Sequence, residues 1–309
     1  GVGWLVVSRD EVRVVTSRIE ADRLRTEELA DDGLKWTVLD WTADAATAIP
    51  TGDRVGCDGV LPGTRDVSAA IEVARRVLLP EEVERYRVLG RDTAQALTAA
   101  CVACGPGDSE FAWAARVAEE VLHRGADPLV LLVAGQERVR LRRHPLPTAA
   151  QAGDLVMVVV CARRHGLVAN ATRFVATGGL PADLADAQPR LLAVEAAFLD
   201  ATRAGTAVSD VLAAGIAAYG KEGFDAEEWR RHHQGGPTGY LSRDHLATPS
   251  ATEPVEDSQA FAWNPSIPGL KVEDTVLCTL AGVEILTADP EWPVVEVAGR
   301  RRPAVLERP

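Results

Sequence analysis

One apolar run limits the fold more than any other feature of the chain. Residues Leu155–Ala162 include no charged residue and no glycine or proline. An apolar run of this length without alternation predicts a β-strand that is buried on both faces. His165-Gly166 predicts a tight turn, and Val168–Phe174 then forms the returning strand. We therefore expect a domain core built on an antiparallel hairpin.

Helical patterns occur in pairs on both sides of this hairpin. Apolar residues recur three and four positions apart over Val67–Leu79, Pro80–Cys104, Asp108–Arg124, Asp183–Gly205 and Val208–Gly220. Further strands are expected at 128–133, 139–143, 234–240, 261–263, 275–280 and 282–286. Paired helices that alternate with antiparallel hairpins predict an α+β domain rather than a doubly wound sheet.

The first part of the chain has a different texture. Gly3–Val7 and Val12–Thr16 predict a hairpin, Ile19–Ala30 an acidic helix, and Trp36–Leu39 a further strand. We expect a small α/β domain over residues 1–74 and a larger domain over residues 75–309. A unit of this size lies at the lower edge of independent stability, so we expect it to pack on the rest of the chain or on a second subunit.

Composition excludes several classes of function. The 45 acidic residues against 33 basic ones give a net charge of −12, which does not suit a nucleic-acid binder. The longest apolar run is far shorter than the roughly 20 residues of a membrane span. Five scattered cysteines predict a reducing, cytoplasmic location rather than a disulfide framework. Motifs for nucleotides, serine hydrolases and zinc peptidases are absent, and we expect no cofactor.

Five short segments occur in an order that is specific when they are taken together. They are Gly105-Pro106-Gly107-Asp108-Ser109-Glu110, Arg143-His144-Pro145, the hairpin with Thr172-Arg173-Phe174, Gly235-Gly236-Pro237-Thr238-Gly239, and Asn264-Pro265 with Lys271–Leu277. In this order they resemble the creatinase, prolidase, aminopeptidase P and methionine aminopeptidase superfamily. The resemblance implies a pita-bread C-terminal domain, a shortened N-terminal domain and a homodimer.

The metal ligands of that family are mostly missing from this sequence. Its peptidases hold two metal ions with two Asp, one His and two Glu. The resemblance places these positions on Val159 or a neighbour, Asn170, Gly236, Asn264 and Glu273. A single carboxylate cannot neutralise two metal ions, so we expect no metal and a mechanism that works without one.

Histidines and Glu273 are the candidate catalytic residues. The resemblance aligns His144 with the acid and base of metal-free creatinase, and a free imidazole titrates in the range that this role needs. Alternation along a strand would place His232 and His233 on opposite faces, and the resemblance favours His232 for the cavity. The glycine pair Gly235-Gly236 permits close approach of a ligand or of another backbone. Glu273 or His232 is the candidate second proton carrier, since an apolar cavity would raise the pKa of Glu273 unless an Arg or a His lies near it.

Five further residues are candidates for substrate binding, together with His233. Arg243 suits a substrate carboxylate or phosphate, since its guanidinium is a permanent cation with a forked geometry. A salt bridge to Asp244 or to another acidic residue is the alternative role. Asn170 and Asn264 both donate and accept hydrogen bonds and suit an amide, urea or hydroxyl group. Tyr240 is a candidate wall residue. Arg173 matches the family hairpin, where the resemblance favours an ion pair within the domain over substrate binding.

The sequence is compatible with two classes of function. The first is a metal-independent hydrolase that cleaves a C–N bond in a small, polar, anionic substrate, as the resemblance to creatinase implies. The second is a catalytically inactive binding module of the same fold. A residual Xaa-Pro-type aminopeptidase is a further alternative if metal ions bind after all. The partner expected in the first case is a small molecule, with no nucleic acid and no membrane.

Overall fold

The computed structural model describes residues 2–29 and 33–309. The chain divides into two compact units, Gly1–Ala74 and Arg75–Pro309. Among the described residues, no helix combines the length and the apolar character that crossing a membrane requires.

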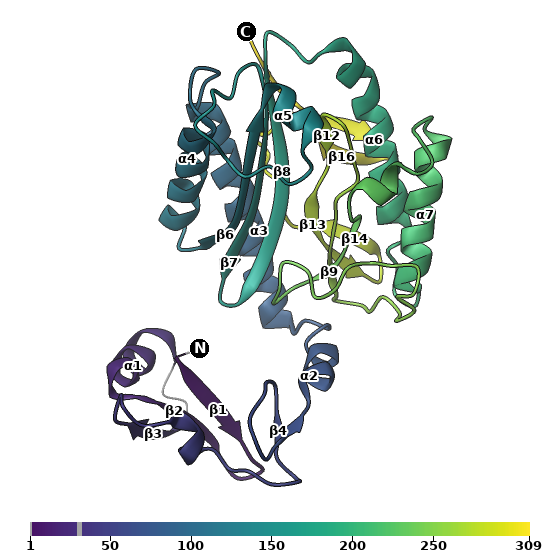
Figure 1. Cartoon of the computed structure of the whole chain (residues 1–309). Coiled ribbons are helices and arrows are strands. Elements are labelled where there is room, and N and C mark those ends of the chain that lie inside the picture. The colour runs from purple at the N-terminus through teal and green to yellow at the C-terminus, as the bar shows by residue number, and fades with distance from the viewer. Residues whose placement is uncertain (1, 30–32) are drawn as a thin grey trace. The chain divides into compact units, whose positions relative to one another are not determined.

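The first unit is a small α/β arrangement around a three-stranded sheet (Figure 1). Strands β1 (Gly3–Val7) and β2 (Val12–Ser17) form the expected antiparallel hairpin, and β3 (Lys35–Leu39) pairs with β2 in parallel. The predicted helix over 19–30 is shorter in the structure. It consists of α1 (Arg18–Arg23) and a π-helical segment, η1 (Leu24–Glu28), and Ala30 lies outside the described residues.

The rest of this unit consists of short elements. They are η2 (Ala45–Ala48), the parallel pair β4 (Gly56–Cys57) and β5 (Arg65–Asp66), and α2 (Ser68–Ala74). The helix expected over 67–79 therefore ends at Ala74.

Two pairs of long helices dominate the second unit. They are α3 (Pro80–Ala103), α4 (Glu110–His123), α6 (Ala182–Ala201) and α7 (Val208–Lys221), close to the ranges that the apolar periodicity predicts. A non-helical connection that contains Gly105-Pro106-Gly107 separates α3 from α4. There the Ser109 hydroxyl accepts a hydrogen bond from the Ala112 amide and caps α4.

The central hairpin is confirmed. Strand β7 (Leu155–Arg164) pairs antiparallel with β8 (Leu167–Thr177), and the apolar run at the start of β7 is buried throughout. His165 and Gly166 have φ of 51° and 82°, so the connection is a two-residue turn with both residues in the left-handed region. This geometry matches the right-handed twist of the two long strands.

The second unit contains two four-stranded sheets. The first has the order β17-β8-β7-β6, with β6 (Asp127–Gly135) on one edge and β17 (Leu306–Arg308) on the other. The second has the order β14-β13-β10-β9 and consists of β9 (Gly235–Thr238), β10 (Ala260–Trp263), β13 (Asp274–Thr279) and β14 (Gly282–Ile285). A bridge between Thr172 and Glu273 joins β8 to the start of β13.

Helices cover the outer sides of the two sheets (Figure 1). One core combines residues of α3 and α4 with one face of the central hairpin, including Val158 and Val160. The other core combines α6 and α7 with the opposite face, including Val159 and Phe174, and with β10. The central hairpin is therefore covered on both faces, as its sequence predicts.

One expected strand is a helix in the structure. The segment 139–143 was expected to be extended, but α5 (Gln136–Leu141) is helical. Val139 is buried in a core, whereas Leu141 is 65% exposed. Burial of one residue per turn suits a short helix, while a strand would place positions 139 and 141 on the same face.

Candidate functional site

One face of the central hairpin points toward the second sheet. Val159 pairs with Thr172 and Cys161 pairs with Asn170, so these four side chains share a face. The Thr172 hydroxyl donates a 2.7 Å hydrogen bond to Oε2 of Glu273. The hairpin positions that the family resemblance assigns to metal ligands therefore do face Glu273.

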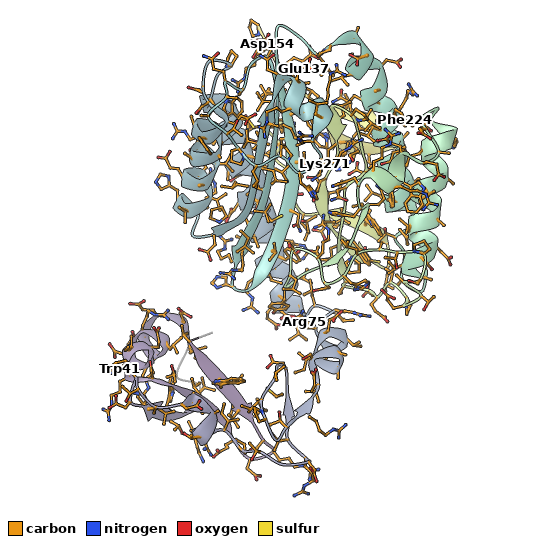
Figure 2. All side chains as sticks on the ribbon, in the orientation of Figure 1. Trp41, Arg75, Glu137, Asp154, Phe224 and Lys271 are labelled. Carbon is orange, nitrogen blue, oxygen red and sulfur yellow. The ribbon has the colours of Figure 1, made fainter. Side chains whose placement is uncertain are left out.

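Glu273 is buried against two cations. Arg243 Nη2 lies 2.6 Å from Oε1, and Lys271 Nζ lies 2.8 Å from Oε2. Lys271 belongs to the two-residue strand β12 (Leu270–Lys271) and lies between the sheets (Figure 2). Two cations on one carboxylate leave the three groups with a net positive charge.

The two cations decide the protonation state of Glu273. Burial raises the pKa of a carboxyl group, but Lys271, Arg243 and the Thr172 hydroxyl outweigh burial and hold the pKa of Glu273 well below its usual range. The sequence predicts a raised pKa only where no Arg or His lies near Glu273, and Arg243 does lie near it. In the structure Glu273 is ionised at neutral pH and has no proton to give.

Lys271 and Thr172 were not among the candidates from sequence. Lys271 lies two positions before Glu273, and in extended chain such residues share a face. That spacing was the available signal. Thr172 gave no local signal, because only the pairing of β8 with the segment before β13 brings it to Glu273.

Three histidines, His144, His232 and His233, form a cluster within the electrostatic influence of Lys271 and Arg243. His144 lies after α5, while His232 and His233 follow η3 (Glu228–Arg231). Nε2 of His144 and Nε2 of His232 are 2.9 Å apart, and the rings of His232 and His233 stack at 4.5 Å. The ring centroids of His144 and His233 are 5.3 Å apart.

Both neighbouring histidines therefore join the same cluster. The expectation that His232 and His233 point to opposite faces is wrong, because both residues precede β9 and lie outside any strand. The alternation of side chains that the prediction used applies only within extended, paired backbone.

The imidazoles are uncharged near neutral pH. Burial, followed by repulsion from Lys271 and the neighbouring rings, lowers the pKa of His232 to about 2. Burial, followed by repulsion from Arg243, lowers that of His233 to about 4. The pKa of His144 is also lowered, by burial and by Lys271. One neutral ring can donate and the other accept in the His144–His232 hydrogen bond.

Several buried polar atoms around the two groups have no hydrogen-bond partner within the described chain. They are Oδ1 of Asn170, Oδ1 of Asn264, Nδ1 of His232, Nδ1 of His233 and Nε of Arg243. The Asn170 amide is oriented by a 3.1 Å hydrogen bond from Nδ2 to Thr238 Oγ1, which leaves its oxygen unpaired. Unpaired buried polar groups are costly, so these atoms mark where a polar ligand would gain most.

The glycine pair after the histidines serves the packing of the backbone. Gly235 has φ +98°, and a Cβ there would lie 2.0 Å from the carbonyl oxygen of Ala262 on β10. Gly236 has φ +149°, and its Cβ would lie 2.7 Å from the carbonyl oxygen of His245. Of the two readings of this pair, close approach of another backbone is the one that the structure contains.

Substitution Gly235→Ala is expected to lower the free energy of unfolding by about 3 kcal/mol, because both the positive φ and the clash with β10 are unfavourable. Denaturant titration followed by circular dichroism measures the loss. The control is Gly220→Ala in α7, where a Cβ meets nothing within 4 Å and the change should be neutral or slightly stabilising. Equal stability of the two variants would contradict the assignment.

Two residues predicted to bind substrate have structural partners elsewhere. The Arg173 guanidinium donates to Asp274 Oδ1 at 2.9 Å and to the Thr287 carbonyl at 2.7 Å. This contact is the ion pair within the domain that the resemblance favoured for Arg173. The Tyr240 hydroxyl donates to Glu82 on α3, so this side chain bonds to the helix layer.

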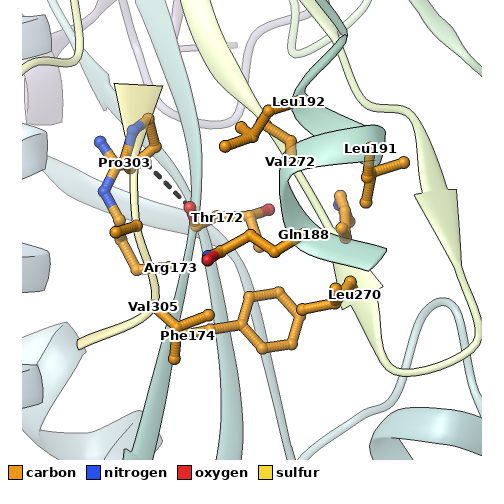
Figure 3. Close-up of a pocket in the computed structure, with 12 residues that line it drawn as sticks. Thr172, Arg173, Phe174, Gln188, Leu191, Leu192, Leu270, Val272, Pro303 and Val305 are labelled. Carbon is orange, nitrogen blue, oxygen red and sulfur yellow. Dashed lines mark hydrogen bonds between the residues drawn. The ribbon is translucent and has the colours of Figure 1, made fainter. Parts of the chain in front are cut away.

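Two cavities lie near the central hairpin. The first has a volume of about 20 Å³, room for about one water molecule, and its lining includes Thr172 and Lys271 (Figure 3). The second has a volume of about 270 Å³ and is lined by Arg173, Asp274 and Trp292, among others. The histidine cluster does not line either of these cavities.

Comparisons with known proteins identify the family of the chain. The model of metallopeptidase family M24 matches residues 84–280, and the chain belongs to this family. No curated protein matches the sequence. The family match confirms the resemblance that the five ordered segments indicated.

Solved structures with low sequence identity share the fold. The prolidase from Pyrococcus furiosus is 18% identical, with a TM-score of 0.80 over 94% of this chain and 90% of that one. X-Pro aminopeptidase from Thermotoga maritima MSB8 is 15% identical, with a TM-score of 0.81 over 99% and 90%. Dipeptidase PepE from Mycobacterium ulcerans is 19% identical, with a TM-score of 0.75 over 99% and 87%. The expected pita-bread fold is thereby confirmed.

The family name implies metal ions, and the residues at the expected ligand positions do not fit them. These positions are held by Val159, Asn170, Gly236, Asn264 and Glu273. Only Glu273 carries a charge, and both of its oxygens are engaged by the ammonium and guanidinium groups beside it. Without further carboxylates, this set cannot offset the charge of two divalent ions.

Proposed function

We propose that this protein is a hydrolase that cleaves a C–N bond in a small, polar, anionic molecule without the dinuclear metal centre of its family. The observation that carries the proposal is the neutral His144–His232 pair, which lies in the electrostatic field of Lys271 and Arg243. Neutral imidazole is the form that can act as a general base at physiological pH.

His144 is the proposed base. In the tautomer in which Nε2 of His144 donates to His232, Nδ1 of His144 carries a lone pair and can take a proton from water. The water oxygen then bonds to the carbon of the C–N group. The C–N bond breaks, and the proton passes from His144 to the leaving nitrogen. His232 acts by holding the tautomer of His144.

The charges and the unpaired atoms support the substrate class. The net positive charge of Lys271, Arg243 and Glu273 favours an anionic group, and Arg243 Nε offers an unpaired donor. The unpaired oxygens of Asn170 and Asn264 suit N–H donors such as those of an amide, urea or amidine. Glu273 takes the role of an ionised anchor for the two cations rather than of a proton carrier.

The test begins with a thermal-shift screen of ureido, amidino and amide compounds, each with and without a carboxylate. A compound that raises the melting temperature is then assayed for release of amine or ammonia. We expect His144→Ala to lower kcat by about 10²- to 10⁴-fold with little change in binding. His123→Ala, at the exposed end of α4, is the matched control and should leave kcat unchanged.

The outcomes separate the alternatives. Binding without turnover in the wild type would assign the protein to the class of binding modules. Full activity of His144→Ala would remove the proposed base. If no compound of the screen binds, the proposed substrate class is wrong.

A further inference from the structure

The three imidazoles are also arranged as a chelating set. One ring nitrogen from each of His144, His232 and His233 lies within 4.8 Å of the other two. None of the three occupies a ligand position that the resemblance assigns to the dinuclear centre. We propose that His144, His232 and His233 bind one divalent transition-metal ion of the zinc class, at a site separate from the family's metal positions.

The distances suit a single ion. A Zn–N bond is about 2.0–2.1 Å long, so two ligand nitrogens on a tetrahedral ion lie about 3.3 Å apart. Nε2 of His144 and Nε2 of His232 are already 2.9 Å apart. A small increase in this separation would give the pair the spacing of two ligands on one ion, and the third nitrogen, within 4.8 Å of the others, would complete the set by a movement of the His233 ring. The ion would replace the hydrogen bond between the two rings.

The donors have the chemistry that such an ion requires. Imidazole nitrogen is a borderline ligand that suits zinc, copper and nickel, and it binds in the uncharged form. Nδ1 of His233 is buried and has no hydrogen-bond partner among the described residues, and the metal would supply that partner. Three histidines leave a fourth coordination position for water or an anion.

An ion pair joins the two chain segments that carry the three histidines. The guanidinium of Arg143 pairs with Glu228, whose side chain is only 6% exposed. Arg143 directly precedes His144, and Glu228 lies on η3 just before His232. The pair thus connects the two segments that supply the ligands and limits the movement of one relative to the other.

The neighbouring cations weaken the binding of a metal ion, and this effect can be tested by substitution. Lys271 and Arg243 both repel positive charge at the histidines, and Glu273 offsets only one of them. Removal of one cation should therefore strengthen metal binding. If the ion instead bound adventitiously to exposed histidines elsewhere, substitution of Lys271 would not change its affinity.

The experiment uses the full chain, freed of metal by chelation and titrated with zinc chloride by calorimetry. We expect one ion per chain. His144→Ala and His233→Ala should each weaken binding at least about 100-fold, while His123→Ala should leave it unchanged. Lys271→Met should tighten binding by about tenfold. Cobalt should give the intense visible absorption of a tetrahedral complex.

Circular dichroism of each variant verifies that it is folded, and His144→Ala, at the most exposed ligand, serves if the others unfold. The proposal fails if zinc does not bind saturably, or if binding survives both His144→Ala and His233→Ala. It also fails if folded Lys271→Met binds zinc more weakly than the wild type. The ion would replace the hydrogen bond on which the proposed base depends, so zinc binding and hydrolysis at His144 exclude each other. The readouts above need no substrate, so the failure of this proposal is distinguishable from the failure of the proposed hydrolysis.

Discussion

Glu273→Gln is expected to lower the free energy of unfolding by about 3–5 kcal/mol, because it leaves the ammonium of Lys271 and the guanidinium of Arg243 buried without their anion. In the wild type both cations lie within 2.8 Å of the carboxylate, which is itself 2% exposed. Urea unfolding followed by circular dichroism measures the difference.

The matched control is Glu296→Gln on the exposed strand β15 (Val294–Val297), which should change stability by less than about 0.5 kcal/mol. Acid provides a second measurement. Since the pKa of Glu273 is lower in the folded than in the unfolded chain, its stabilisation is complete above the unfolded pKa and is lost as pH falls. A loss in Glu273→Gln no larger than in the control would refute the buried ion cluster.

Arg302→Met is expected to lower the free energy of unfolding by about 3–5 kcal/mol. Arg302, on β16 (Arg300–Pro303), is 2% exposed and pairs with Glu195 of α6 and with Asp274 at the start of β13. Its removal leaves two buried carboxylates, of which Asp274 keeps its ion pair with Arg173. The measurement is the urea midpoint at pH 7.

The neighbour Arg301 is exposed, and Arg301→Met is the matched control with an expected change near zero. The double variant Arg302→Met, Glu195→Gln should recover part of the loss, because one of the unpaired charges is then removed. If the double variant is as unstable as the sum of its single changes, the charges do not interact as the structure indicates. Asp274 directly follows Glu273, so this network also fixes the strand that presents Glu273 to the site.

Local sequence patterns were sufficient for the framework of the fold. The apolar run Leu155–Ala162 specified a strand buried on both faces because each of its side chains requires apolar surroundings. His165-Gly166 specified the turn, since a two-residue hairpin loop needs backbone in the left-handed region. The paired helical patterns and the five ordered segments led to the right family.

The same patterns failed where local chemistry permits two structures. Apolar and basic residues alternate at the start of the segment 139–143, which suits a strand. Helix α5 nevertheless covers most of this segment, and Val139 is its residue that packs in the core. His232 and His233 were assigned opposite directions on the assumption of a strand, but β9 begins after them at Gly235.

The sequence by itself determined which chemical groups are present and which are missing. It showed that a valine, a glycine and two amides stand at ligand positions of the family, and that Glu273 alone remains. Only the tertiary structure decided what state Glu273 is in. Its partners Arg243 and Thr172 lie 30 and 101 positions away in the chain. Because the pKa and the charge of a buried group depend on distances in space, the folded chain made Glu273 an ionised anchor and gathered three histidines into one uncharged cluster.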